Sequence, residues 1–320
     1  MKRFVDFCRA RSTPELLPPK EFHGFGDWLQ VDCETPNAVI YEAYFARSAA
    51  LVAQAAEVLG QDSDAKRYAE LRDAVKRAFV RAYVKDDGTV LGDTQCAYVL
   101  ALAADLLDGE AKTRALAKLV RNIESRKGHL STGVVGTKDL LQVLSRAGRD
   151  DVAWRLVENV DYPSWGFTIR QGATTIWERW NGWTPEKGFE DPNMNSFSHY
   201  AFGAVYHWMA ATIGGIRSDA PGFAAIRIAP RPGGGVTWAD VDYDSVRGPI
   251  ASRWKIEGDA LLVETTIPPN TTATIEVPTS DPASATSPEL SAAGGAPPVE
   301  RPGCAIFSVG SGTWHFRAKR

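Results

Sequence analysis

A carboxylate set between tryptophans is the feature of this sequence that points most directly to chemistry. Glu178 lies between Trp177 and Trp180 in the stretch from Gly172 to His207, and four of the ten tryptophans fall between positions 177 and 208. Flat apolar faces of this kind can stack on a sugar ring while the acid activates water or moves a proton. The pattern therefore favours a sugar-processing site in which Glu178 does the acid–base work.

A polar run directly downstream of Glu178 offers further groups for such a site. It ends in Asn195 and His199, just before an apolar helical pattern. A histidine at the start of an apolar helix is ordinarily a core residue, and Trp180 and Asn195 are equally compatible with a pocket wall and with the scaffold behind it. The other histidines lack metal-ligand spacing, so we expect no metal and no cofactor.

Composition narrows the choice of partner and compartment. The 320 residues carry a net charge of −3 and contain no basic run, which argues against a nucleic-acid partner. No segment approaches the roughly 20 apolar residues of a membrane span, so no membrane partner is expected. The first residues are charged and do not form a signal peptide, which predicts a cytoplasmic protein. Four scattered cysteines without CxxC spacing predict neither disulfides nor a zinc site.

The spacing of apolar residues along the chain changes near Ile226. Upstream, from 37 to 213, apolar residues recur at helical spacing between short turns, which predicts antiparallel helix pairs in a bundle, a solenoid or a closed toroid. The absence of a fixed sequence repeat counts against the solenoid. Downstream, period-two alternation predicts antiparallel strands of a β-sandwich. We therefore predict a helical domain over 1–215, a hinge over 216–225 and a β-domain over 226–320.

Shorter signals mark individual segments within these domains. A helical pattern over 37–59 stops at Gly60, and a last helix is predicted over about 197–213. Segments rich in glycine, proline and small polar residues predict loops over 128–137 and 279–303.

Motifs along the whole chain are similar to those of one known family. They are GDWL (26–29), HLSTGVVGT (129–137), GATTIWERW (172–180), MNSFSHYAFGAV (194–205), APRPGGGVTWA (229–239) and VGSGTWHF (309–316). The chain resembles the bacterial α-L-rhamnosidases of glycoside hydrolase family 78. GATTIWERW together with MNSFSHYAFGAV is the most specific part of the likeness, whereas GDWL alone would be weak.

The resemblance implies a fold, a reaction and roles for individual residues. Members of the family have an (α/α)6 barrel of twelve helices, the six-hairpin glycosidase fold, followed by a β-sandwich. They hydrolyse terminal α-L-rhamnosides with inversion, so a rhamnose-containing glycoside is the implied substrate. The general base lies in the TTIWERW motif, which places it on Glu178. Trp28 and His199 match residues that line the rhamnose pocket in the family.

One departure from the family pattern bears on activity. Family members carry an acid-rich segment of the type DCPQRDERLGWTGD upstream of GDWL, and this sequence has none; it also shows about seven helices in place of twelve. We therefore expect the second half of an (α/α)6 toroid followed by an antiparallel β-sandwich, without the general acid and with the N-terminal half as its partner. A non-catalytic carbohydrate-binding remnant and an inactive gene fragment remain the alternatives.

Overall fold

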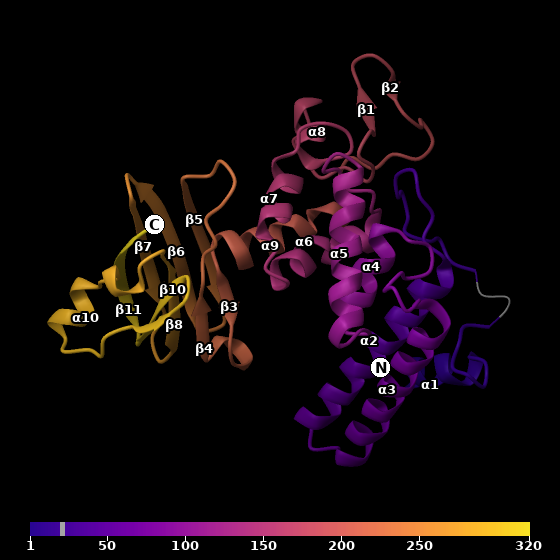
Figure 1. The fold of residues 1–320 in the computed structure, drawn as a ribbon, viewed down its shortest axis with the longest axis horizontal. Coiled ribbons are helices and arrows are strands. Elements are labelled where there is room, and N and C mark those ends of the chain that lie inside the picture. The colour runs from indigo at the N-terminus through magenta and orange to yellow at the C-terminus, as the bar shows by residue number, and fades with distance from the viewer. Residues whose placement is uncertain (20–22) are drawn as a thin grey trace. The chain divides into compact units, whose positions relative to one another are not determined.

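Helices make up the first part of the chain and strands the second, which confirms the predicted fold class (Figure 1). The computed structural model describes residues 1–19 and 23–320, which form two compact units, Met1–Ala204 and Val205–Arg320. The helices of the first unit are α1 (Lys2–Arg11), α2 (Asn37–Val58), α3 (Asp62–Tyr83), α4 (Gln95–Ala103), α5 (Gly109–Ser125), α6 (Val134–Arg146), α7 (Asp150–Glu158) and α8 (Trp165–Arg170). None of the described helices combines the length and apolarity needed to cross a bilayer.

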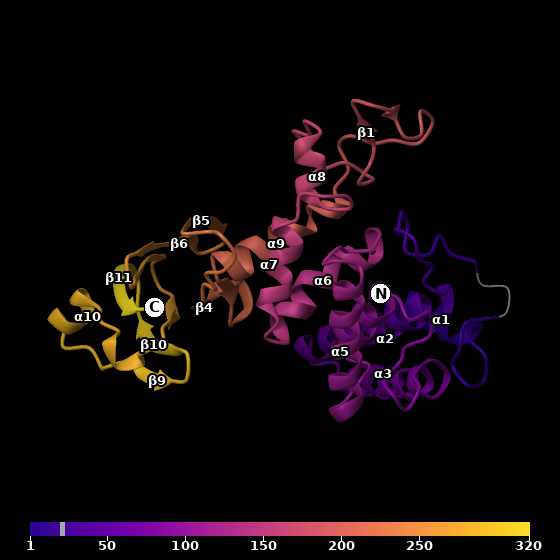
Figure 2. The ribbon, with the colours of Figure 1, turned by 45° about the horizontal axis from the view of Figure 1, so that its top comes forward.

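The helices of the first unit pack as successive hairpins. Helices α2 and α3 lie side by side in both ribbon views, and α4 with α5 and α6 with α7 form the next pairs (Figure 2). Helix α4 also packs against both α2 and α6, so α2, α4 and α6 form one layer and their partners α3, α5 and α7 flank it. This arrangement is the paired-helix packing that the spacing of apolar residues predicted.

Local sequence explains where these helices begin and end. The buried residues of α2 include Val39, Phe45 and Val52, and the helix packs against α1, α3 and α4. The helix stops just before Gly60, whose φ of 65° turns the chain so that the amide of Gln61 donates to the carbonyl of Ala56 at 2.8 Å. Helix α4 begins where the Thr94 hydroxyl accepts a bond from the amide of Ala97.

An isolated carboxyl lies inside this helical layer. The side chain of Glu42 on α2 is fully buried, and neither of its oxygens has a hydrogen-bond partner among the described residues. Burial raises the pKa of Glu42 to about 8. Tyr83 at the end of α3 is close enough for the Glu42 charge to add to burial in raising the Tyr83 pKa to about 12. Glu42 is therefore expected to make stability depend on pH.

Four segments of the first part differ from the sequence-based prediction. Helix α6 starts at Val134, inside the predicted loop 128–137, and α8 was not predicted. The Trp-rich segment contains a two-stranded ribbon of β1 (Trp183–Thr184) and β2 (Gly188–Phe189). The predicted helix 197–213 is interrupted, because its first residues pair with another segment. It becomes a 3-10 turn at Ala201–Ala204, helix α9 at Val205–Trp208 and a π-helical turn at Met209–Ile213.

The second unit is built from two sheets that enclose one core. The five-stranded sheet has the order β3-β4-β8-β10-β9 and the four-stranded sheet the order β11-β7-β6-β5. Buried side chains from both sheets, among them Ile226, Trp254, Ile275 and Phe307, form the core. The strands are β3 (Ile216–Ser218), β4 (Ala225–Ile228), β5 (Trp238–Ser245), β6 (Gly248–Glu257), β7 (Ala260–Ile267), β8 (Thr272–Pro278), β9 (Val299–Arg301), β10 (Cys304–Val309) and β11 (Gly312–Lys319).

The sandwich departs from the prediction in three details. Strand β4 pairs with β8 in parallel, because the chain passes through β5, β6 and β7 of the other sheet between them. Strand β3 forms at 216–218, inside the predicted hinge, since its backbone pairs with β4. The predicted loop 279–303 holds the short helix α10 (Pro288–Ala292) and strand β9.

Candidate active site

Two segments of irregular backbone pair to present Glu178. The amide of Glu178 donates to the carbonyl of Ser196 at 2.8 Å, and the amide of His199 donates to the carbonyl of Ile176 at 2.8 Å. The Thr175 hydroxyl donates to the carbonyl of Phe197 and extends the same pairing. These bonds satisfy backbone groups that regular structure would otherwise satisfy, and they fix the position from which the Glu178 side chain projects.

Both oxygens of the Glu178 carboxylate accept a hydrogen bond. The indole Nε1 of Trp28 donates to Oε1 at 3.2 Å, and the amide of Ser196 donates to Oε2 at 3.2 Å. Trp28 lies 150 residues before Glu178 in the sequence and remains 39% exposed, so the pair is open to solvent. A carboxylate has about four lone-pair sites, so these two bonds orient the group and leave acceptor positions for a water molecule.

Trp28 is itself held by a buried carboxylate, Asp27. One oxygen of Asp27 accepts from the amide of Gly133 at 2.8 Å, and the other accepts from those of Val135 and Gly136 at 2.8 and 2.9 Å. These amides begin α6, where a negative charge is favoured by the helix dipole. Burial raises the pKa of the Asp27 carboxyl, and the bonds from Gly136, Gly133, Cys96 and Val135 oppose that rise.

The loop and the helix approach so closely that only glycine fits between them. A Cβ added to Gly133 would lie 2.1 Å from the carbonyl oxygen of Trp28 and 2.4 Å from that of Asp27. The same carbonyl of Trp28 accepts a bond from the amide of Val134 at 2.8 Å. Helix α6, Asp27, Trp28 and Glu178 therefore form one chain of contacts that sets the position of the carboxylate.

Family models match both parts of the chain. Residues 1–213 match the bacterial alpha-L-rhamnosidase 6 hairpin glycosidase domain, and residues 215–291 match the bacterial alpha-L-rhamnosidase C-terminal domain. The chain belongs to the bacterial α-L-rhamnosidase family.

Individual relatives agree with this assignment. An alpha-L-rhamnosidase of Streptomyces avermitilis is 44% identical over 301 residues, which cover 94% of this chain and 28% of that protein. An alpha-L-rhamnosidase of Formosa agariphila is 41% identical over 288 residues, which cover 87% of this chain and 31% of that protein. The crystal structure of the Streptomyces avermitilis alpha-L-rhamnosidase complexed with L-rhamnose superposes with a TM-score of 0.92 and 42% identity, over 99% of this chain and 30% of that one. The chain thus spans less than a third of these α-L-rhamnosidases.

The other predicted pocket residues lie around Glu178 in different ways. The ring of His199 stacks on Tyr200, with centroids 5.3 Å apart, and its Nδ1 accepts from the amide of Ala201 at 3.3 Å. Its backbone thus lies beside the Glu178 segment while its ring contacts its own neighbours. The role of His199 as a rhamnose ligand remains a prediction.

Trp180 and Asn195 occupy supporting positions. The Trp180 indole is 2% exposed, stacks on Phe202 at 3.9 Å and meets the edge of Trp165 at 5.2 Å. This burial favours the scaffold alternative for Trp180. Asn195 donates from Nδ2 to the carbonyl of Asp191, and its buried Oδ1 has no partner among the described residues.

Sequence reasoning did not single out Asp27 or Ser196. The signal for Asp27 was present in the GDWL motif, where this carboxylate precedes Trp28, but only its contact with α6 shows what it does. The Ser196 contribution comes from a backbone amide, which leaves no trace in residue type. Across the described residues, no group of three or more His, Cys, Asp or Glu side chains could hold a metal ion.

Proposed function

We propose that this chain carries the base-bearing part of an α-L-rhamnosidase active site, with Glu178 as the general base. The observation that supports this most is the Glu178 carboxylate itself, fixed by Trp28 and Ser196 at 3.2 Å each yet open to water. In inverting hydrolysis a carboxylate takes a proton from the water that attacks the anomeric carbon, and an acid on the other side protonates the leaving oxygen. Glu178 fits the first of these roles.

The acid must come from a second carboxyl about 6.5–9.5 Å away, which leaves room for the water. We propose that it comes from the N-terminal half of the barrel, which is also the partner of this chain. An exposed apolar surface on the first unit supports that partner: Phe4 and Phe7 of α1 are 62% and 58% exposed. Together with Tyr41 and Tyr44 they line a groove of about 530 Å³. A surface of this kind favours a covering partner over contact with water.

Activity of the chain alone and in a chimaera tests the proposal. In the chimaera, residues 1–320 replace the matching segment of the Streptomyces avermitilis α-L-rhamnosidase, which is 44% identical. We expect no measurable turnover of an aryl α-L-rhamnoside by the chain alone, because one positioned proton transfer is typically worth about 10²–10⁴-fold. We expect the chimaera to be active. Turnover by the chain alone would show that catalysis needs no group from a partner. A folded but inactive chimaera would favour the alternative of a non-catalytic carbohydrate-binding remnant.

The bond from Trp28 to Glu178 predicts a specific kinetic defect in the chimaera. Trp28→Phe keeps an aromatic ring but removes the N–H that donates to Oε1. A hydrogen bond to a charged group is worth about 1.5–3 kcal/mol, so we expect kcat to fall about 10- to 100-fold with KM little changed. Steady-state kinetics would measure both constants. Phe25→Leu, which removes the ring that packs against Trp28 but keeps the indole N–H, is the control and should retain most of kcat. A rise in KM at constant kcat would instead assign Trp28 to sugar binding alone.

A further inference from the structure

We propose that the outer face of the four-stranded sheet, β11-β7-β6-β5, is a binding site for a short neutral oligosaccharide. This site lies wholly within the second unit and shares no residue with the surroundings of Glu178. Its lining includes Trp238, Arg253, Glu264, Pro288, His315 and Arg317, and the groove that they form has a volume of about 670 Å³. Small-molecule sites typically enclose roughly 300–1,000 Å³.

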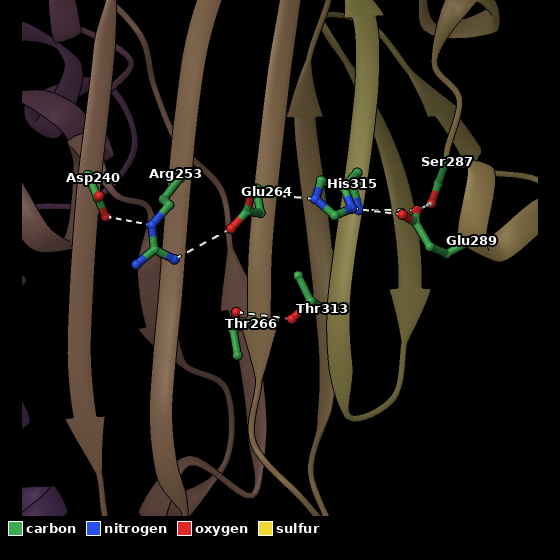
Figure 3. A network of polar contacts seen from close by, with 8 residues as sticks. All are labelled: Asp240, Arg253, Glu264, Thr266, Ser287, Glu289, Thr313 and His315. Atoms are coloured by element: carbon green, nitrogen blue, oxygen red, sulfur yellow. Dashed lines mark hydrogen bonds and ion pairs between the residues drawn. The ribbon is translucent and has the colours of Figure 1, made fainter.

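A row of paired charges crosses the floor of this groove (Figure 3). The strand register sets Asp240 opposite Arg253, Arg253 opposite Glu264, and Glu264 opposite His315. Arg253 Nε lies 2.9 Å from Asp240 and its other nitrogens 2.9 Å from Asp242 and 3.7 Å from Glu264. His315 continues the row, with Nε2 3.4 Å from Glu264 and Nδ1 2.7 Å from Glu289 of α10. The row therefore holds its polar groups in fixed positions before any ligand arrives.

A second row on the same face supplies an aromatic platform. This row lies two residues away from the charged row on each strand. In it, the register aligns Trp238 with Lys255, Lys255 with Leu262, and Leu262 with Arg317. Residues two apart on a strand share a face, so this row runs beside the charged one. The Trp238 ring is 66% exposed, which is unusual for so large an apolar surface. An exposed indole beside fixed donors and acceptors suits a sugar ring, whose faces are apolar and whose edge carries hydroxyls.

The charges of this face are largely paired with one another, which favours a neutral ligand over an ion. Arg253 faces three carboxylates, His315 lies between two, and Lys255 pairs with Glu257 at 2.6 Å. An added anion would meet the carboxylates, and an added cation would meet Arg253 and Arg317. Hydroxyl groups can both donate to the carboxylates and accept from the guanidinium, which keeps unused N–H donors. Four strands about 4.8 Å apart give a row of about 14 Å, long enough for roughly two or three sugar rings.

Isothermal titration calorimetry of the 320-residue chain with defined trisaccharides tests the assignment. Cellotriose, maltotriose, xylotriose and mannotriose are the neutral probes, and trigalacturonic acid is the anionic one. We expect one-to-one binding of at least one neutral trisaccharide. Trp238→Ala should weaken that binding about tenfold or more, which corresponds to about 1.4 kcal/mol, whereas Trp238→Tyr should retain most of it. Glu264→Gln, which breaks the charged row at its centre, should also weaken it.

Two controls separate this site from other surfaces. Tyr243→Ala removes another partly exposed aromatic ring of β5 that does not line the groove, and it should leave the affinity unchanged. Glu178→Gln should also leave it unchanged, which distinguishes the groove from the candidate active site. The proposal is overturned if no neutral trisaccharide binds, if only trigalacturonic acid binds, or if Trp238→Ala and Glu264→Gln both bind as well as the unsubstituted chain.

Discussion

Glu178→Gln in the chimaera is expected to lower kcat on an aryl α-L-rhamnoside by about 10²–10⁴-fold, the usual worth of a positioned general base. The glutamine side chain has nearly the same size, and its one oxygen can still accept one of the two bonds from Trp28 and Ser196, but it cannot take a proton from water. The fold and substrate binding should therefore survive, and KM should change little. Steady-state kinetics on the purified chimaera would give both constants.

A matched substitution in the same segment makes this result specific. Glu186 is an exposed carboxylate in the connection between β1 and β2, and Glu186→Gln removes the same charge without touching the site. We expect its kcat to equal that of the unsubstituted chimaera. Undiminished turnover in Glu178→Gln would exclude Glu178 as the base, and an equal loss in both variants would point to a general effect of charge.

The sequence predicts those parts of the fold that depend on local pattern. Helices α2 and α3 follow from apolar spacing and from the stop at Gly60, and the strands follow from the alternation that begins near Ile226. The failures lie where distant groups override local preference. Helix α6 starts early because Asp27, more than a hundred residues away, binds its first amides. The helix predicted over 197–213 cannot start at Phe197, because Ser196 and His199 bond the Glu178 segment.

The candidate site shows the same division. Motif resemblance is enough to name Glu178 and Trp28, since both lie in recognisable stretches of the sequence. It does not predict that the indole N–H of Trp28 points at the carboxylate, because that contact joins positions 150 residues apart. Trp180 shows why density of tryptophan is an ambiguous signal: it belongs to the same motif, yet it packs between Phe202 and Trp165.

The second large expected effect is on protein stability and comes from Glu42. Its pKa rises from 4.5 to about 8 on folding because the carboxyl is buried without a partner among the described residues. Between these values the folded protein keeps a proton that the unfolded chain has released. The free energy of unfolding must therefore fall as pH rises through this window, by about 1.4 kcal/mol per pH unit. The contribution of this group is fully favourable below pH 4.5 and is lost above pH 8.

Glu42→Gln should remove this dependence, because glutamine fills the same space and does not ionise. The free energy of unfolding of the variant minus that of the unsubstituted chain should be about 3 kcal/mol larger at pH 7.5 than at pH 5, so the variant gains relative stability as the pH rises. Urea denaturation followed by circular dichroism across this range would measure it. Glu57→Gln, at an exposed position of the same helix, should show no such trend. If the stability difference between Glu42→Gln and the unsubstituted chain does not change with pH, then Glu42 ionises in the folded protein as readily as in the unfolded chain, and burial does not raise its pKa.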